Sequence, residues 1–230
     1  ICATHTHSGP EVFTKSKLGP QNSIPAGRID QFYLQTLIKK MAGSVLIAHK
    51  DMQEGSRKTG SQVRIGAAKG KIPEILYNRR PKLADGKVEM AFTLVPEVAA
   101  TRKIVAEPEG CVKVTFTLPH GETQLDFGPI DPEVCVLRVE DADGQIVGSL
   151  VNFGCHPVCI YPYLGTAISA DYPAVTTQVV EQMEGGICLF TLGLAGNTVP
   201  LWRGEKPRQR IGKVLAGEAL RRLQIATTTE

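Results

Sequence analysis

The spacing of apolar residues along the chain predicts helices near both ends. One covers residues 30–50 and begins at Asp30, whose carboxylate can cap the first turn. Its apolar positions recur at intervals near the 3.6 residues of a helical turn, at Phe32, Tyr33, Leu37, Met41 and Val45. Another helix covers residues 207–223, and the residues expected on one of its faces are Ile211, Val214, Leu215 and Leu220.

A further helix is predicted at residues 169–184. Ser169 or Asp171 can cap it, and Pro173 falls in its first turn, where a missing backbone N–H costs nothing. The residues expected to face inward are Val175, Val179 and Met183.

Apolar runs of strand length separate these helices. They lie at residues 1–5, 62–68, 75–77, 133–152 and 187–194. Residues 133–152 form two runs around a glycine-containing turn at 141–144, which predicts a β-hairpin. Residues 187–194 are almost continuously apolar, which predicts a central strand buried on both faces.

Strands that alternate with helices place the chain in the α/β class, and we expect a mixed sheet with flanking helices and the active site at the strand ends. Residues 1–230 are predicted to form a single α/β catalytic-type domain. The net charge of +3, from 26 Lys and Arg against 23 Asp and Glu, excludes a polybasic nucleic-acid-binding coat. No apolar run approaches the ~20 residues of a transmembrane segment.

Three predicted strands end in polar or glycine-rich corners, where α/β proteins bind ligands. These corners, at 4–10, 154–157 and 193–200, hold three of the five histidines. On an extended strand His5 and His7 would point to the same side, with Cβ atoms roughly 7 Å apart. Two such imidazoles can converge on zinc, or one can bind the metal while the other faces the substrate. An ordinary pair of histidines beside a turn is the alternative.

The third histidine of these corners is His156, which precedes Pro157 and is therefore expected to have an extended backbone. It is either a metal ligand or a buried histidine bonded to the backbone. Cys155 and Cys159 flank it and raise the alternative of a thiolate metal site or a local disulfide. The six cysteines include no Cys-x-x-Cys pair and four lie in apolar runs, which favours buried inert thiols.

Other polar corners supply candidate substrate contacts. Arg79 follows Asn78 at the end of a strand, and its fork of donors suits a carboxylate, a phosphate or a developing oxyanion. A surface ion pair is the alternative for this arginine. Asp171 can be simply a helix cap, and Asn197 can belong to a tight turn. We take Asn78, Asn197 and Asp171 as candidate substrate-binding residues.

Six short segments follow one another along the chain: THTHSGP at 4–10, NRR at 78–80, IDPEV at 130–134, VNFGCHP at 151–157, ISADY at 168–172 and GLAGNTVP at 193–200. In this order they resemble the N-terminal catalytic domain of the neutral/alkaline (non-lysosomal) ceramidase family. The likeness is closer to the shorter bacterial members of unassigned substrate than to the true ceramidases.

This resemblance implies a zinc-dependent hydrolase that cleaves an amide, or an ester, by metal-activated water. By their positions in the motifs, His5 and His156 match the family's histidine zinc ligands, and His7 matches the active-site histidine beside the metal. Arg79 matches an arginine that contacts the reacting group or the substrate. The implied substrate is a small-molecule or lipid-like amide, as in lipid metabolism, and no nucleic-acid partner is implied. Export is also implied by the family, although no N-terminal signal region is present in the sequence.

Two departures from the family pattern change these expectations. Val199 stands where the true ceramidases have a catalytic serine, which excludes a serine-dependent route and argues against ceramide as the substrate. The family's remaining zinc ligands, a Glu and a Tyr, come from segments beyond residue 230, and its opening strand and helix precede residue 1. The domain is therefore expected to be incomplete at both ends. The alternative function is a non-catalytic fragment or binding protein that retains the fold without the complete metal site.

Overall fold

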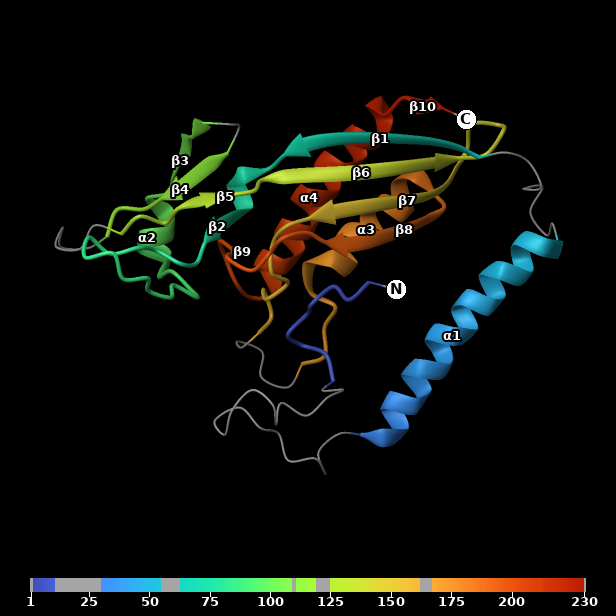
Figure 1. The fold of residues 1–230 in the computed structure, drawn as a ribbon, viewed down its shortest axis with the longest axis horizontal. Coiled ribbons are helices and arrows are strands. Elements are labelled where there is room, and N and C mark those ends of the chain that lie inside the picture. Colours follow the sequence, from blue (N-terminus) through green and yellow to red (C-terminus); the bar gives the residue numbers. More distant parts are fainter. Residues whose placement is uncertain are drawn as a thin grey trace. The chain divides into compact units, whose positions relative to one another are not determined.

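The computed structural model describes residues 2–10, 30–54, 63–108, 111–118, 125–161 and 167–229. The chain divides into two units, one made of Ile1–Ser8 with Arg64–Glu230 and the other of Gly9–Val63. The second unit contains helix α1, Gln31–Glu54 (Figure 1). Asp30 caps this helix, since its Oδ1 accepts a hydrogen bond from the Tyr33 N–H at 2.9 Å. The helix predicted at 30–50, with its cap, is confirmed.

The first unit is built on a five-stranded sheet with the order β10-β1-β6-β7-β8. Its strands are β1 Arg64–Lys71, β6 Glu133–Glu140, β7 Ile146–Phe153, β8 Ile187–Leu192 and β10 Thr228–Thr229. The predicted hairpin is confirmed, because β6 and β7 pair antiparallel and the Asp141 carboxylate accepts hydrogen bonds within the turn that joins them. β8 runs parallel to β7, so the sheet is mixed, as expected.

Two helices, α3 (Asp171–Glu184) and α4 (Glu205–Ile225), cover one face of this sheet (Figure 1). They approach each other closely at Gly212, where an added Cβ would lie 2.5 Å from Cβ of Val175. The buried side chains between the helices and the sheet form one continuous core, which includes Val134, Val151, Phe153, Tyr172, Leu215 and Leu223. The α/β class with flanking helices is therefore confirmed.

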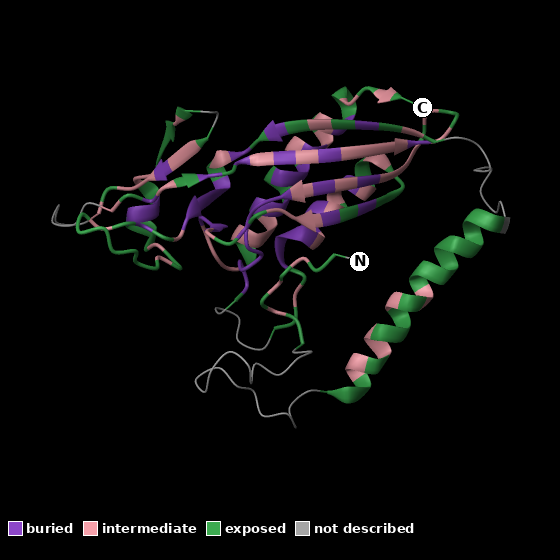
Figure 2. Ribbon diagram, in the orientation of Figure 1, coloured by how far each residue is buried: buried purple, intermediate pink, exposed green. Residues whose placement is uncertain are grey.

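Along strands β6, β7 and β8, buried residues alternate with partly or fully exposed ones (Figure 2). On β8, Cys188 and Phe190 are buried, whereas Ile187 and Leu189 are 57% and 58% exposed. The prediction of a central strand buried on both faces is wrong: β8 is an edge strand of this sheet. A continuous apolar run does not reveal on its own whether a second layer covers the other face of its strand.

Helix α3 differs from its prediction in two details. It begins at Asp171, and Ala170 occupies the N-cap position without a side-chain capping bond. The two predicted caps still bond to the first turn, since the Ser169 hydroxyl accepts from the Asp171 N–H and the Asp171 carboxylate accepts from the Tyr172 N–H. Met183 is 69% exposed, whereas Val180 is fully buried, because the inward face follows Val175 and Thr176. In α4, Ile211 and Leu215 are buried as expected, but Val214 is 36% exposed.

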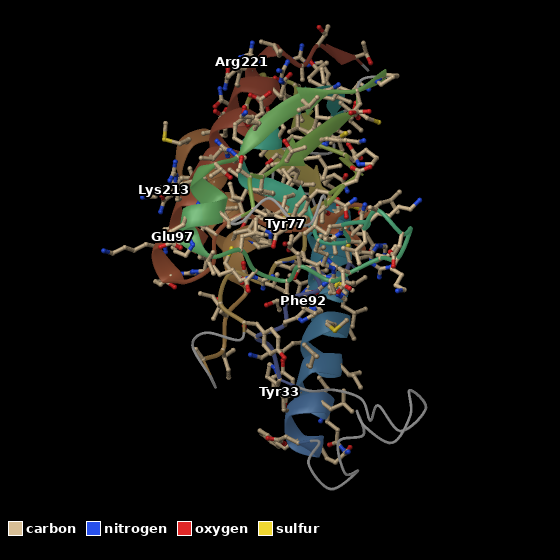
Figure 3. All side chains as sticks on the ribbon, turned by 90° about the vertical axis from the view of Figure 1, so that its left-hand side faces the viewer. Tyr33, Tyr77, Phe92, Glu97, Lys213 and Arg221 are labelled. Carbon is tan, nitrogen blue, oxygen red and sulfur yellow. The ribbon has the colours of Figure 1, made fainter. Side chains whose placement is uncertain are left out.

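Short elements extend the first unit beyond the main sheet. They are β2 Leu76–Asn78, α2 Pro96–Ala100, β3 Lys103–Ala106, β4 Val112–Thr115, β5 Pro129–Ile130 and β9 Thr198–Pro200. β2 pairs antiparallel with β9, which aligns Asn78 with Thr198. Tyr77 of β2 is fully buried in the interior of the unit (Figure 3), and its hydroxyl donates to the carbonyl of Ala91 at 2.8 Å.

The segment predicted as a strand at residues 1–5 has a different structure. Residues 2–6 form no strand, and His5 adopts a left-handed backbone with φ of 65°. Extended geometry therefore does not explain how His5 and His7 face one another. No helix within the described residues is long and apolar enough to span a membrane.

Leu215 and Leu189 provide a matched test of the covered and open sides of the sheet. Leu215→Ala is expected to lower the free energy of unfolding by about 2–5 kcal/mol, because it leaves a cavity between α4 and the sheet. Leu189→Ala is expected to lower it by less than about 1 kcal/mol, because that side chain is already largely in water. Urea denaturation of both variants measures the difference, and equal losses would contradict an open face.

Candidate metal centre

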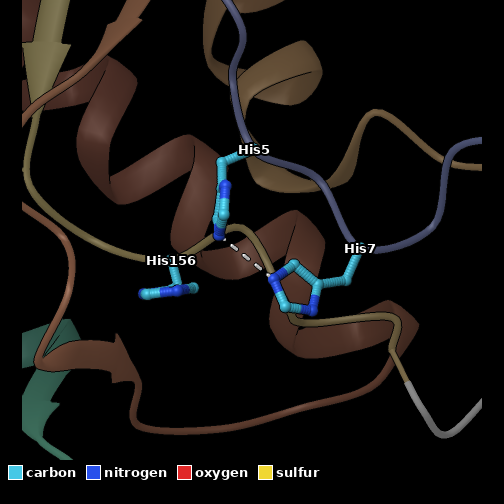
Figure 4. A group of neighbouring side chains, drawn as sticks. All are labelled: His5, His7 and His156. Carbon is cyan, nitrogen blue, oxygen red and sulfur yellow. Dashed lines mark hydrogen bonds between the residues drawn. The ribbon is translucent and has the colours of Figure 1, made fainter. Parts of the chain in front are cut away.

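Three imidazoles converge at the carboxyl end of β7 (Figure 4). Nε2 of His5 and Nε2 of His7 are 3.3 Å apart. The ring centroid of His156 lies 4.9 Å from that of His5 and 5.7 Å from that of His7. One potential ligand nitrogen from each of the three side chains lies within 4.8 Å of the others. The structure thus brings together all three histidines that the sequence motifs singled out.

His156 is held by the corner that follows β8. Because β7 and β8 are parallel, their carboxyl ends lie at the same edge of the sheet. The His156 N–H donates to the carbonyl of Thr198 at 3.1 Å. Its Nδ1 lies 2.5 Å from the carbonyl oxygen of Ala195 and 3.2 Å from that of Thr198. Carbonyls only accept hydrogen bonds, so Nδ1 carries the proton and the lone pair of the neutral ring is on Nε2.

His5 and His7 are held by contacts with the segment before α3. The Thr6 hydroxyl donates to the carbonyl of Ser169 at 2.8 Å, and the Ser169 N–H donates to the carbonyl of Ser8 at 2.9 Å. These two bonds fix the backbone on both sides of His7. The left-handed conformation of His5 is uncommon for a residue with a Cβ and turns its ring toward the other two histidines (Figure 4).

The environment keeps His156 neutral. Burial lowers the pKa of His156 below its usual value, and the positive charge of Arg79 lowers it further. The two carbonyl contacts act in the opposite direction but do not reverse the shift. Neutral imidazole is the form that binds metals, so His156 is in its ligand form at neutral pH.

The spacing of two of these histidines can be compared with that of zinc ligands. Nitrogen ligands bind zinc at about 2.0–2.1 Å, so two nitrogens on one tetrahedral ion lie roughly 3.3–3.4 Å apart. The 3.3 Å between His5 Nε2 and His7 Nε2 matches that separation. The Nδ1–H contact of His156 is the second hydrogen bond that metal-ligating histidines ordinarily make. This donor set fits a divalent transition metal, and it does not identify which one.

Arg79 lies next to the histidine cluster. Its Nη2 donates to the carbonyl of Gly196 at 3.0 Å, and its guanidinium carbon lies 5.4 Å from the centre of the Phe92 ring. Its Nε is buried and has no partner in the described part of the chain. Burial lowers the pKa of Arg79, as do the neighbouring charges of Arg80 and Arg203. No ion pair of Arg79 occurs among the described residues, so the predicted surface ion pair is not seen there.

The two asparagines shape the backbone around Arg79. Asn78 is buried, donates from Nδ2 to the carbonyl of Pro129 at 2.9 Å, and accepts from the Arg80 N–H through Oδ1. The carbonyl of Asn197 accepts from the Arg79 N–H at 2.7 Å. These contacts fix the ends of β2 and β9. The substrate-binding roles of Asn78 and Asn197 stay predictions.

Asp171 supports the loop that carries His156. Its side chain is fully buried, and its Oδ2 accepts from the Ile160 N–H at 3.0 Å while its Oδ1 accepts from the Tyr172 N–H at 2.7 Å. The Tyr172 hydroxyl in turn donates to the carbonyl of Cys155. The start of α3 therefore holds the loop on both sides of His156. The substrate-binding role of Asp171 stays a prediction, and its observed contacts are those of a positioning residue.

The cysteines flanking His156 do not form a thiolate site in this structure. Cys155 and Cys159 are both buried and unpaired as disulfides. Burial raises the pKa of each thiol well above its usual value, so neither is a thiolate at neutral pH. Within the described residues, the histidine cluster is the one group of three or more His, Cys, Asp or Glu side chains arranged to hold a metal.

Comparisons with known proteins give only distant likenesses. The fold is similar to that of a neutral ceramidase from Pseudomonas aeruginosa, with 18% sequence identity and a TM-score of 0.46. It is also similar to that of a ceramidase complexed with C2, with 17% sequence identity and a TM-score of 0.47. Each similarity covers 72% of this chain and 23% of the other chain, so this chain spans less than a quarter of their length. No family model matches the chain, and no curated protein does. No family assignment follows from these likenesses.

Two aromatic residues near the centre were not singled out by the sequence. The ring of Tyr161 lies 5.5 Å from that of His7, and Phe92 lies beneath the guanidinium of Arg79. Neither belongs to a recognisable motif or an apolar periodicity. Their positions beside His7 and Arg79 depend on loops that meet only in the folded chain, so no local sequence signal could have revealed these contacts.

Asp171 offers a test of how the centre is held in place. Asp171→Ala removes the acceptor from two buried N–H groups and leaves alanine in a left-handed conformation, which we expect to cost about 2–4 kcal/mol of unfolding free energy. Asp171→Asn retains one carbonyl acceptor and tolerates that conformation, so it is expected to cost less than half as much. Urea denaturation measures both variants. Asp143→Ala, in an exposed turn, is the control and should lie within about 0.5 kcal/mol of wild type.

Proposed function

We propose that this chain carries the metal site of a zinc-dependent hydrolase that cleaves an amide bond, or alternatively an ester bond. The observation that supports the proposal best is the convergence of ligand nitrogens of His5, His7 and His156 within 4.8 Å beside a partly buried arginine, Arg79. The ordered motifs that resemble the neutral ceramidase family support it independently. The proposed substrate class is a small-molecule or lipid-like amide.

In this proposal His5 and His156 hold the metal. His156 is the better defined of the two, because its Nδ1–H is bonded to the corner after β8 and its Nε2 lone pair is directed away from that corner. When bound, zinc polarises a carbonyl group and lowers the pKa of a water molecule toward neutrality. The protein's own contribution at these residues is to present two imidazoles at one place, with His156 kept neutral by burial.

His7 is proposed as the proton donor. Its ring lies beside His5 and Tyr161, at 5.0 and 5.5 Å between centroids. An imidazole there can donate a proton to the leaving amine. This protonation matters because an unprotonated amine is a poor leaving group when an amide C–N bond breaks. His7 is exposed to solvent, so it can exchange that proton with water between turnovers.

Arg79 is proposed to stabilise the oxyanion that develops on the reacting carbonyl. One of its nitrogens is bonded to Gly196, and it lies close enough to His156 to depress that residue's pKa. The remaining guanidinium donors are held in a partly buried place, where a hydrogen bond to developing negative charge is stronger than in water. Its contacts with Phe92 and Gly196 fix the direction of the group in advance.

Zinc binding by single-histidine variants tests the metal site. His5→Ala and His156→Ala are expected to weaken zinc affinity at least about 100-fold, because each removes a direct ligand. His7→Ala is expected to retain zinc within about tenfold while losing activity. Isothermal titration with zinc measures these affinities, with His49→Ala on α1 as the matched control. If zinc does not bind the wild-type protein, or binds His156→Ala equally well, the proposal is wrong.

Hydrolysis of N-acyl amides tests the reaction. The zinc-bound protein is expected to release an amine from a panel of N-acyl amides, and chelation of the metal should abolish this release. Arg79→Gln should lower kcat by about 100- to 1,000-fold and leave zinc affinity unchanged, as expected for loss of an oxyanion donor. Amine release can be followed by reaction with a fluorogenic amine reagent. An equal rate for Arg79→Gln and wild type would refute the role of the arginine.

The rival function is a binding protein that retains the fold without catalysis. Val199 favours it, since this residue lies fully buried in β9 and offers no nucleophile at the position where the true ceramidases have a serine. Zinc binding without hydrolysis of any amide in the panel, or of matched esters, would support this rival function.

A further inference from the structure

A second concave site lies beside the short helix α2. It is a cavity of about 590 Å³, a size within the roughly 300–1,000 Å³ of most small-molecule sites. Its walls come from two stretches of chain, residues 93–102 and 200–207. None of the three clustered histidines lines it, so the cavity is a separate feature from the metal centre.

Much of the cavity wall is apolar. Ala99 and Leu201 are buried in it, and Leu94 and Trp202 are partly buried against the core. Trp202 is the single tryptophan of the chain. Such walls favour a ligand with an apolar body, since its burial removes apolar surface from water on both sides.

Three guanidinium groups surround this apolar wall. Those of Arg102 and Arg210 lie 5.7 and 4.5 Å from the centre of the Trp202 ring, and Arg203 lines the cavity directly. Over the described residues, no ion pair joins any of the three to a carboxylate. Glu205, at the start of α4, is engaged by Arg208 at 2.6 Å. The wall thus carries positive charge without a neutralising partner among these residues.

The hydrogen bonds of these arginines leave that charge uncompensated. Arg102 donates to the carbonyl of Glu74, and Arg203 donates to the carbonyls of Val158, Tyr161 and Phe92. Backbone carbonyls are neutral and do not cancel a positive charge. In addition, Nε of Arg203 is buried without a partner within the described residues. An anion at this wall would gain charge-assisted hydrogen bonds in partly desolvated surroundings.

We propose that this cavity binds a small organic carboxylate with an apolar body. The carboxylate would pair with Arg102 and Arg203, and the apolar body would lie against Leu94 and Trp202. A guanidinium suits this anion because its parallel N–H groups match the two carboxylate oxygens. This inference does not depend on the metal centre or on the proposed hydrolase activity.

The emission of Trp202 tests the proposal directly, because it is the chain's single tryptophan. Titration with 4-phenylbutanoate is expected to change this emission saturably. The neutral isostere 4-phenylbutanamide should bind at least tenfold more weakly, since it lacks the charge, and acetate should also bind weakly, since it lacks the apolar body. Absence of a saturable change, or equal binding of the carboxylate and the amide, would overturn the proposal.

Variants assign the binding to this cavity. Arg102→Gln should weaken 4-phenylbutanoate binding at least tenfold, and Ala100→Phe, which narrows the cavity from an exposed position and keeps the charge, should weaken it as well. Arg221→Gln, on the exposed side of α4, is the matched control and should bind like wild type. His156→Ala should also bind the carboxylate normally, which separates this site from the metal centre. Unchanged binding by Arg102→Gln would show that the carboxylate lies elsewhere.

Discussion

The arrangement of the centre depends on the hydrogen bonds between Nδ1 of His156 and the carbonyls of Ala195 and Thr198. They join the loop after β7 to the corner after β8, and they determine both the tautomer and the orientation of the His156 ring. The proton is placed on Nδ1, so the lone pair is left on Nε2. The ring is also fixed in direction, since two acceptors restrain one N–H. Without this contact His156 would be a buried histidine with no defined ligand atom.

The remaining parts of the unit keep this contact in place. The parallel pairing of β7 with β8 aligns the two strand ends, and the buried carboxylate of Asp171 holds the loop that follows His156. The antiparallel pairing of β2 with β9 brings Arg79 to the same corner through the Asn197 carbonyl. Each of these elements is common in α/β folds. Their combination at one edge of the sheet places three imidazoles and a guanidinium together.

Much of this arrangement could be anticipated from the sequence, and the errors have physical causes. The hairpin at 133–152 and the cap at Asp30 follow from local turn and capping chemistry, and both are confirmed. The motif order picked out His5, His7 and His156, although the described residues 2–5 of the expected strand form none and His5 turns inward through a left-handed backbone. The open face of β8 was not predicted, because an apolar run is compatible with a strand that is covered on one face or on both. The sequence did allow a buried His156 bonded to the backbone, which is what the structure shows, but it could not identify the carbonyls of Ala195 and Thr198 as the partners.

Whether histidines of this cluster share one metal ion can be measured by X-ray absorption at the zinc K-edge of the zinc-bound protein. We expect nitrogen scatterers at about 2.0–2.1 Å together with the outer-shell scattering of at least two imidazole rings. In His156→Ala, with enough zinc added to occupy the weakened site, the imidazole contribution should fall by one ring. A spectrum without imidazole scattering, or one that is identical in wild type and His156→Ala, would contradict the account.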